Sequence, residues 1–326
     1  MRAHVGLPTL TAWRTALPVA AVLSAALAAG GCAGTASGGT AAAGSGSGHS
    51  AGLIEAIGAE NEYTSVIAQV GGKYVHADAI LSNPNTDPHT FEASPAVARE
   101  IGAARLIVQN GVGYDPWATT IENAAPSGSR KVINVQQLLG LPDSTPNPHL
   151  WYKPTTMPAV ASAIATDLGQ IDPAHASYYK ANAATFIASL APWNQAIAAF
   201  KAKYANTPVA TTEPVADYML QAAGTDNLTP WTFQADVMNG VDPSPQGVSI
   251  EQNLFKQHKV KVFVYNQQVT DPLTESFISD AKAAGIPVIG VYETMPTPGY
   301  DYQSWMEAEV NALDKAVADH VSTQKL

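Results

Sequence analysis

Apolar runs with strand-like spacing alternate with helical runs over most of the chain, from about residue 52 to residue 292. Residues 75–81 alternate at the period of two that a strand requires, and Ser94 and Pro95 then open an amphipathic run as an N-cap and a first-turn proline do. This rhythm predicts an α/β fold with a mostly parallel sheet and helices on both faces. Further elements expected in this half are strands at 105–109 and 131–135 and a helix near 116–124.

One long helical stretch interrupts the alternation. It starts at Asp172-Pro173 and keeps helical spacing of apolar residues on both sides of Pro192, its one later proline. We expect a single rigid helix of about thirty residues, straight or bent at Pro192, that links two lobes. A second alternation follows, with strands at 208–212, 260–265 and 287–292 and helices at 214–223, 249–257, 272–284 and 301–320.

The N-terminal residues have the pattern of an export signal. Arg2 and Arg14 accompany an apolar stretch, residues 17–29, which has the length of a signal-peptide core and is too short to span a membrane. Small residues at 28–31 lead directly to Cys32, the only cysteine, and this arrangement resembles a bacterial lipobox. We expect cleavage before Cys32 and a lipid anchor on it. The alternative is an ordinary secretory signal with an incidental cysteine.

The expected organisation therefore has five segments. Residues 33–50 are uncharged and rich in Gly, Ala, Ser and Thr, as in a flexible tether. The segments are a lipoprotein signal peptide (1–31), a tether (32–51), an N-terminal α/β lobe (52–172), a linking helix (173–204) and a C-terminal α/β lobe (205–326).

Size and charge restrict the functions that the chain can have. Removal of the signal leaves about 295 residues, enough for two lobes with separate cores. The formal net charge is −10, and the signal contains two arginines and no acids, so the remainder is more acidic still. An acidic chain without a basic run argues against binding of nucleic acid or of anionic lipid, and it is compatible with attraction of cations.

Two tripeptides about sixty residues apart carry the clearest chemical signal. Asp87-Pro88-His89 and Asn147-Pro148-His149 each place an imidazole after a proline, which fixes its own φ and restricts the residue before it. Imidazole is the commonest side-chain metal ligand near neutral pH, and a rigidly held ligand loses little entropy on binding. Either tripeptide alone is also compatible with an ordinary loop histidine.

Two carboxylates follow strands that are expected in the second half. Glu213 ends the run 208–212, and Glu293 ends the run 287–292. Ligands of open α/β sheets bind at the carboxyl ends of the strands, which is where both side chains fall. A role as a helix cap or surface acid is the alternative for each.

These residues belong to a longer resemblance, which covers residues 53 to about 320. The chain resembles the metal-binding lipoproteins of the bacterial zinc/manganese ABC-transporter family, the cluster A-I solute-binding proteins. The resemblance implies two α/β lobes joined by one long rigid helix, with the metal between the lobes. Its motifs are Ala59-Glu60-Asn61 with Tyr63, Asp87 to Glu92, Asn110 to Tyr114 with Trp117, Asn147 to Trp151, Asp172-Pro173 with Tyr178-Tyr179, and Thr212-Glu213-Pro214 with Tyr218.

Carried over position by position, the resemblance implies four metal ligands. They are His89 and His149 from the first lobe and Glu213 and Glu293 from the second. Asn266 falls where many relatives have a glutamate, and it is expected either to support the ligands from behind or to be a satisfied amide at a strand end. The remaining histidines after the tether are expected in the bodies of elements, without a partner at ligand spacing, and are not taken as ligands: His76, His175, His258 and His320.

The resemblance implies a non-enzymatic, extracytoplasmic, monomeric binding protein at the bacterial cell membrane. It would capture Mn²⁺ or Zn²⁺ as the transported ligand and deliver it to an ABC permease with a cytoplasmic ATPase. Two imidazoles and two carboxylates suit borderline divalent metals, and glutamate in place of a third histidine tilts the site toward manganese. A metal-dependent hydrolase or a surface adhesin are the alternatives. No Gly-x-Ser-x-Gly, His-Glu-x-x-His or Gly-rich phosphate loop supports an enzyme.

Overall fold

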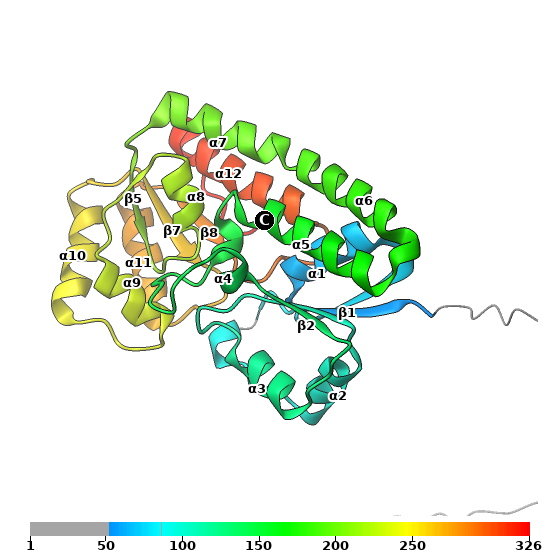
Figure 1. Cartoon of the computed structure of the whole chain (residues 1–326). Coiled ribbons are helices and arrows are strands. Elements are labelled where there is room, and N and C mark those ends of the chain that lie inside the picture. Colours follow the sequence, from blue (N-terminus) through cyan, green and yellow to red (C-terminus); the bar gives the residue numbers. More distant parts are fainter. Residues whose placement is uncertain (1–51, 86) are drawn as a thin grey trace, which may run out of the picture. The chain divides into compact units, whose positions relative to one another are not determined.

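The computed structural model describes residues 52–85 and 87–326; the expected signal peptide, tether and Cys32 lie outside these residues. In the described part, two four-stranded parallel sheets lie in two lobes (Figure 1). The sheet orders are β2-β1-β3-β4 and β6-β5-β7-β8, so the α/β prediction is confirmed. The strands are β1 (Ile54–Glu60), β2 (Val75–Leu81), β3 (Leu106–Gln109), β4 (Lys131–Asn134), β5 (Pro208–Thr211), β6 (Asp226–Asn227), β7 (Val262–Asn266) and β8 (Val288–Val291).

Helices cover both faces of the first sheet. Successive residues of β1 point to opposite sides, so that Ala56 packs into the large core with α1 and α5, whereas Ile57 packs with α2 and α3. Figure 1 shows these two helix layers on either side of the strands. The helices of this lobe are α1 (Asn61–Gly71), α2 (Pro95–Ala103), α3 (Pro116–Ala124), α4 (Val135–Leu138) and α5 (Thr156–Ile171). The pattern had not identified β1, α1, α4 or α5.

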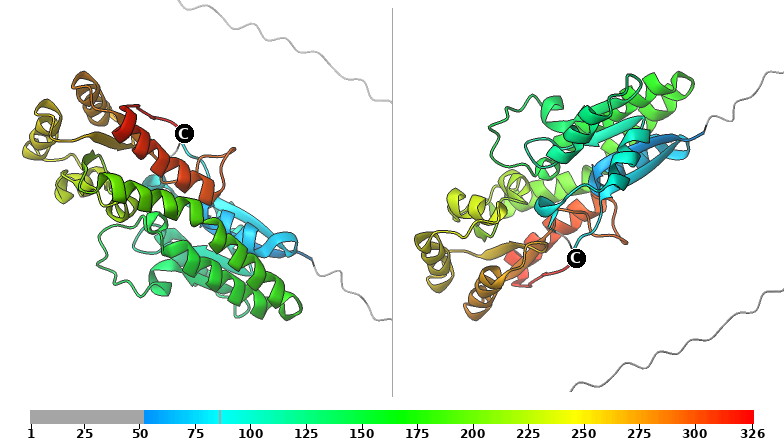
Figure 2. Two further views of the ribbon diagram at one scale, coloured as in Figure 1. Left: turned by 90° about the horizontal axis from the view of Figure 1, so that it is seen from above. Right: turned by 90° about the horizontal axis from the view of Figure 1, so that it is seen from below.

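The linking segment consists of two consecutive helices. A 3-10 turn at Pro173–His175 leads into α6 (Ala176–Ser189), and α7 (Ala191–Tyr204) continues after Leu190. Leu190 keeps right-handed helical angles, but Pro192 lies in the first turn of α7 and has no N–H to extend the hydrogen-bond ladder. The expected long helix is therefore present as α6 and α7, which follow one another in Figures 1 and 2, and the break between them lies next to Pro192.

The second lobe repeats the layered arrangement. Its helices are α8 (Asp217–Ala222), α9 (Trp231–Met238), α10 (Pro245–Lys256), α11 (Pro272–Ala283) and α12 (Tyr302–Asp319). α10 starts four residues before the predicted start at residue 249, because Ser244 and Pro245 act as N-cap and first-turn proline. The Ser244 hydroxyl accepts from the Gly247 N–H at 3.1 Å, just as Ser94 caps α2. None of the helices in residues 52–85 and 87–326 is long and apolar enough to cross a bilayer.

A shared core joins the two lobes. Tyr302, at the start of α12, is fully buried and contacts the rings of Phe186, Trp193 and Trp305. Its hydroxyl donates to the Trp151 carbonyl of the first lobe at 2.5 Å. The same apolar cluster runs through residues of both sheets. Because interiors are close-packed and stiff, this joint fixes the separation of the two strand edges that face each other.

Two histidines do not lie inside elements, contrary to the sequence expectation. His258 follows α10 in a turn with φ 49°, and His320 ends α12 with φ 57°. Both are in the left-handed region, which terminates helices and which the hydrophobic pattern alone does not reveal.

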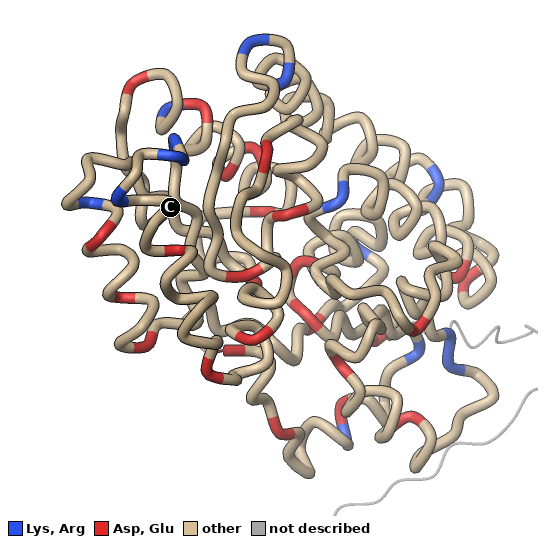
Figure 3. Tube along the Cα trace, turned by 90° about the vertical axis from the view of Figure 1, so that its left-hand side faces the viewer, with Lys and Arg blue, Asp and Glu red and all other residues tan. Residues whose placement is uncertain are grey.

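Acidic residues occur throughout both lobes (Figure 3), and several carboxyls are buried. Glu309 on α12 is fully buried; its Oε1 accepts from the Trp305 indole N–H at 2.9 Å and lies 3.2 Å from the Tyr152 hydroxyl, whereas its Oε2 has no partner. Burial, only partly opposed by these hydrogen bonds, raises the pKa of Glu309 to about 8. Between the ordinary pKa of a glutamate and about pH 8, the folded protein therefore holds a proton on Glu309 that the unfolded chain releases.

Replacement of Glu309 by glutamine should flatten the pH dependence of stability. A carboxyl with a raised folded pKa stabilises the fold below its ordinary pKa, and this contribution is lost as pH rises toward about 8, by about 1.4 kcal/mol per pH unit. We expect Glu309→Gln to reduce the slope of unfolding free energy against pH by about this amount between pH 5 and 8. Urea unfolding of metal-free protein measures it, with the exposed Glu275→Gln as control. Identical slopes in Glu309→Gln and wild type would contradict the assignment.

Candidate metal centre

Both Asx-Pro-His tripeptides form the same tight turn. The Asp87 Oδ1 accepts from the His89 N–H at 2.8 Å, and the Asn147 Oδ1 accepts from the His149 N–H at 2.9 Å. Each side chain thus imitates a backbone turn in front of a 3-10 helix. The repeated spacing in the sequence reflects one local structure that aims two imidazoles.

Glu293 reaches the site from the other lobe. It follows β8, and its loop is held by Gln268, whose Oε1 accepts from the N–H groups of Glu293 and Thr294 at 2.6 and 2.7 Å. Asn61, at the start of α1, exchanges two hydrogen bonds of 2.9 Å with the backbone of Met295. Both lobes therefore fix the loop that carries the carboxylate.

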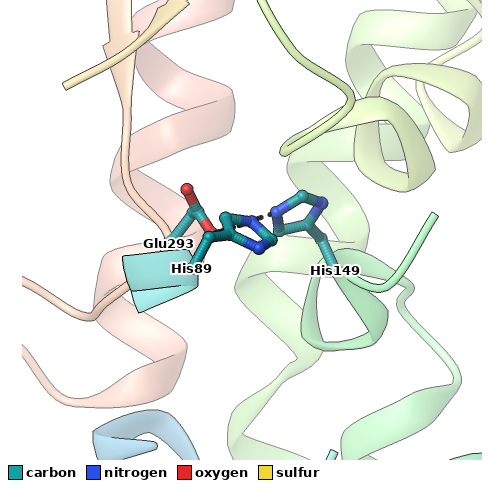
Figure 4. Close-up of side chains that lie close together, drawn as sticks. All are labelled: His89, His149 and Glu293. Carbon is teal, nitrogen blue, oxygen red and sulfur yellow. Dashed lines mark hydrogen bonds and ion pairs between the residues drawn. The ribbon is translucent and has the colours of Figure 1, made fainter. Parts of the chain in front are cut away.

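Three ligand atoms converge between the lobes (Figure 4). The Glu293 Oε2 lies 3.1 Å from the His89 Nε2 and 3.2 Å from the His149 Nε2. A metal ion with ligand distances of about 2.0–2.2 Å and angles of roughly 90–110° holds neighbouring ligand atoms about 2.9–3.5 Å apart. The His149 and Glu293 side chains are fully buried, whereas that of His89 is 21% exposed. The separations fit a bound ion, and His89 marks the side that solvent reaches.

The hydrogen bonds of Asn147 determine which nitrogen of His149 faces the carboxylate. The Asn147 Nδ2 donates to the Pro214 carbonyl at 2.7 Å, so its Oδ1 points to the His149 Nδ1 at 2.8 Å. The His149 Nδ1 must then carry a proton, which leaves the Nε2 lone pair toward Glu293 in the neutral ring. The His89 Nε2 faces the same carboxylate at 3.1 Å. A proton or a metal ion between the nitrogens and the Glu293 Oε2 is therefore needed to satisfy these groups together.

The protonation states follow from burial and charge. Burial raises the pKa of Glu293, but hydrogen bonds and positive charge from the facing His149 and His89 rings, where these are protonated, outweigh it and hold this pKa well below its usual range. Burial lowers the pKa of His149. Burial also lowers the pKa of His89, but the hydrogen bond and charge of Glu293 reverse this and raise it. The single carboxylate favours one positive charge on the two rings. Because the pKa of His89 is raised and that of His149 is lowered, the partly exposed His89 is the ring that takes this proton.

Two residues to which the sequence assigned no role position the converging groups: Tyr114 holds the carboxylate, and Asn147 orients His149. The Tyr114 hydroxyl donates to the Glu293 Oε2 at 2.9 Å. Tyr114 was part of the recognised motif, but only its contact across the lobes shows what it does. In the sequence, Asn147 stood out only as the residue before Pro148. Both tripeptides, however, have a side-chain acceptor two residues before the histidine, and this repeat could have predicted the orienting role of Asn147.

Glu213 lies outside the converging group. It is buried; its Oε1 accepts from the Asn266 Nδ2 at 3.2 Å, and its Oε2 has no partner. The same Asn266 Nδ2 donates to the Glu293 Oε1 at 2.6 Å. Burial and the charge of Glu293 raise the pKa of Glu213 well above its usual value. The structure thus brings three of the four expected ligands together. The fourth, Glu213, is connected to Glu293 through the side-chain amide of Asn266.

The other described histidines are remote from this group, and one expectation about them is wrong. His76 does have partners at ligand spacing, namely Glu55 and Asp78. Glu55 comes from a different strand, which is why spacing along the sequence did not show the group. His175 contacts only Asp172 among carboxylates, at 2.6 Å.

Comparisons with known proteins show the family to which the chain is related. A model of the family described as "Zinc-uptake complex component A periplasmic" (ZnuA) matches residues 60–316. A putative metal-binding protein of Treponema pallidum is 28% identical over 148 residues, 40% of this chain and 46% of that protein. The zinc-binding protein AdcA of Streptococcus pyogenes serotype M3 is 20% identical over 268 residues, 72% of this chain and 50% of AdcA. The chain thus spans about half the length of these relatives.

A solved structure shows the same fold. The solute-binding protein FpvC of Pseudomonas aeruginosa, in complex with Mn²⁺, superimposes with a TM-score of 0.67 at 21% identity, over 82% of this chain and 99% of FpvC. The two-lobe fold is therefore shared with FpvC.

Loss of Asn147 should release His149 from its single tautomer. Asn147→Ala removes the acceptor of the Nδ1 proton, so the ring should populate the Nε2–H form, and metal affinity should fall by about 10–100-fold, as for other residues that orient a ligand. The ¹⁵N shifts of the His149 ring measure the tautomer. Asn147→Asp retains the acceptor and should preserve the Nδ1–H form. A wild-type tautomer in Asn147→Ala would contradict the orienting role.

Proposed function

The chain belongs to the ZnuA family of periplasmic zinc-uptake complex components, and on this premise we propose that it captures a divalent transition metal, Mn²⁺ or Zn²⁺, outside the cytoplasmic membrane. The cation is the transported ligand, which the protein delivers to an ABC permease with a cytoplasmic ATPase. The observation that carries this function is the convergence of two imidazole nitrogens and one carboxylate between the lobes.

The donor set suits a borderline divalent ion. His89 and His149 supply neutral nitrogen, and Glu293 supplies negative charge, with its other oxygen already held by Asn266. The Oε2 of Glu213 has no partner, so its carboxyl is available as a fourth ligand once it loses its proton. Two nitrogens and two oxygens tilt the choice toward Mn²⁺, because zinc sites contain more nitrogen or sulfur.

Capture and release follow from the burial of the ligands. His89 is the most exposed ligand and carries the proton in the metal-free state, so an incoming ion displaces a proton there. His149 and Glu293 are fixed by Asn147, Tyr114 and residues of both lobes, and they stay in position. We propose that binding orders the surroundings of Glu213 without a wide closure of the lobes, since the shared core limits hinge motion.

A solute-binding role accounts for the site better than catalysis does. A catalytic metal keeps a coordination position open to substrate, with a general base beside it. Here two ligands are fully buried, and a second carboxyl, that of Glu213, accepts a hydrogen bond from Asn266. We propose that the protein is monomeric, that Cys32 carries the lipid anchor, and that the permease is its main partner.

Removal of any converging ligand should abolish tight metal binding. His89→Ala, His149→Ala and Glu293→Gln each lose a coordination bond, and we expect the affinity for Mn²⁺ and Zn²⁺ to fall more than about 100-fold, beyond the loss from an orienting residue. Calorimetry on metal-free protein measures this. His258→Asn, which tolerates the left-handed turn, is the control and should bind as wild type does. Equal affinities in all four variants would exclude the site.

Metal should stabilise both lobes as one unit, because its ligands come from both. A thousandfold excess over Kd should add about 4 kcal/mol to the free energy of unfolding. Glu213→Gln should keep part of this gain, because Glu213 lies outside the converging group, whereas Glu293→Gln should lose it all. Thermal unfolding with and without Mn²⁺ tests this. A metal-independent melting temperature in the wild type would refute the interlobe site.

A further inference from the structure

A second group of potential metal ligands lies on the first sheet. In the parallel pair of β1 and the edge strand β2, Glu55 stands opposite His76, and Asp78 follows His76 on the same face. The three side chains are all exposed, and their ligand atoms lie within 4.8 Å of one another. The register of two strands thus assembles one imidazole and two carboxylates.

The separations match those of a metal site. The His76 Nδ1 lies 2.9 Å from the Glu55 Oε2 and 3.4 Å from the Asp78 Oδ2. Ligand atoms around an ion with bonds of about 2.0–2.2 Å stand roughly 2.9–3.5 Å apart. By contrast, the His175–Asp172 distance of 2.6 Å is that of a short hydrogen bond to a single carboxylate.

The surroundings of the group are concave and acidic. Glu55 and Asp78 line a hollow of about 160 Å³ together with Glu100 of α2, which adds a third carboxylate to its wall. Within the described part of the chain, no Lys or Arg forms an ion pair with any of these three acids. Apart from His76, no ion-pair partner in the described part of the chain offsets the negative charge of these carboxylates. This charge favours binding of a divalent cation.

We propose that Glu55, His76 and Asp78 form a second metal-ion site, distinct from the interlobe site, that binds a borderline divalent cation such as Zn²⁺. One imidazole with two or three carboxylates is a donor set that such ions accept. The two sites lie toward opposite ends of β1, because Glu55 and Glu60 are separated by about 16 Å of strand. Asn61, directly after Glu60, contacts the loop of Glu293.

The second site should bind more weakly than the first. Its side chains are exposed and must lose rotamer freedom when they bind, and water competes for the ion. The interlobe ligands are instead held by Asn147, Tyr114 and Asn266 before the ion arrives. The surface site is therefore filled only after the interlobe site.

Zn²⁺ titration of the full chain, purified without a polyhistidine tag and freed of metal, tests the proposal. Calorimetry should resolve a tight event and a weaker event in the wild type. His76→Gln and Asp78→Asn should each weaken the second event more than about tenfold and leave the first unchanged. Both positions are exposed, so these variants should fold normally. His175→Gln, which alters the single-carboxylate pair, should retain both events.

A spectroscopic measurement separates the two sites. In His149→Ala, where the interlobe site is damaged, Zn²⁺ should still shift the ring ¹⁵N signals of His76. Retention of the weak event in His76→Gln, or a His76 ring that does not respond to Zn²⁺, would overturn the second site. Loss of only the tight event in His149→Ala would bear on the interlobe function alone, so the two proposals fail independently.

Discussion

The arrangement of the molecule depends on one interaction, the contact between the Glu293 carboxylate and two imidazole nitrogens. The carboxylate comes from one lobe, and His89 and His149 come from the other. Because the Asn147 side chain fixes the proton of His149 on Nδ1, the Nε2 lone pair faces a negative charge across 3.2 Å. Such an arrangement is stable only when a proton or a metal ion lies between the groups. The joint between the lobes is thus also the proposed metal site.

The frame around this joint explains how the distances are maintained. Tyr302 ties α12 to the Trp151 backbone of the first lobe, and Asn61 ties α1 to the loop after Glu293. Each contact crosses the boundary between the lobes close to the metal centre, and the apolar core is continuous beneath them. A close-packed core does not deform gradually. The proposed response to metal is therefore a local adjustment near Glu213 rather than a rotation of whole lobes.

The two groups proposed as metal ligands have similar separations in opposite environments. At the interlobe site, burial makes an unpaired charge costly, so hydrogen bonds from Tyr114 and Asn266 prepare the carboxylate in advance. At the β1–β2 edge, Glu55 and Asp78 are exposed to solvent, and the ion-pair partner of both in the described part of the chain is His76, itself a member of the group. Desolvation, rather than donor chemistry alone, thus separates a tight site from a weak one.

The sequence by itself determined the alternating α/β elements, the Ser94 and Pro95 helix start, the two Asx-Pro-His tripeptides and the glutamates after β5 and β8, because caps, periodicity and proline act within a few residues. It did not reveal α5, whose N-cap Thr155 forms no side-chain cap, or the left-handed turn at His258. Only the tertiary structure decided that three expected ligands converge while Glu213 is hydrogen-bonded to Asn266, and that Glu55 lies opposite His76. Such distances arise from packing between segments that lie far apart in the sequence, and no local pattern records them.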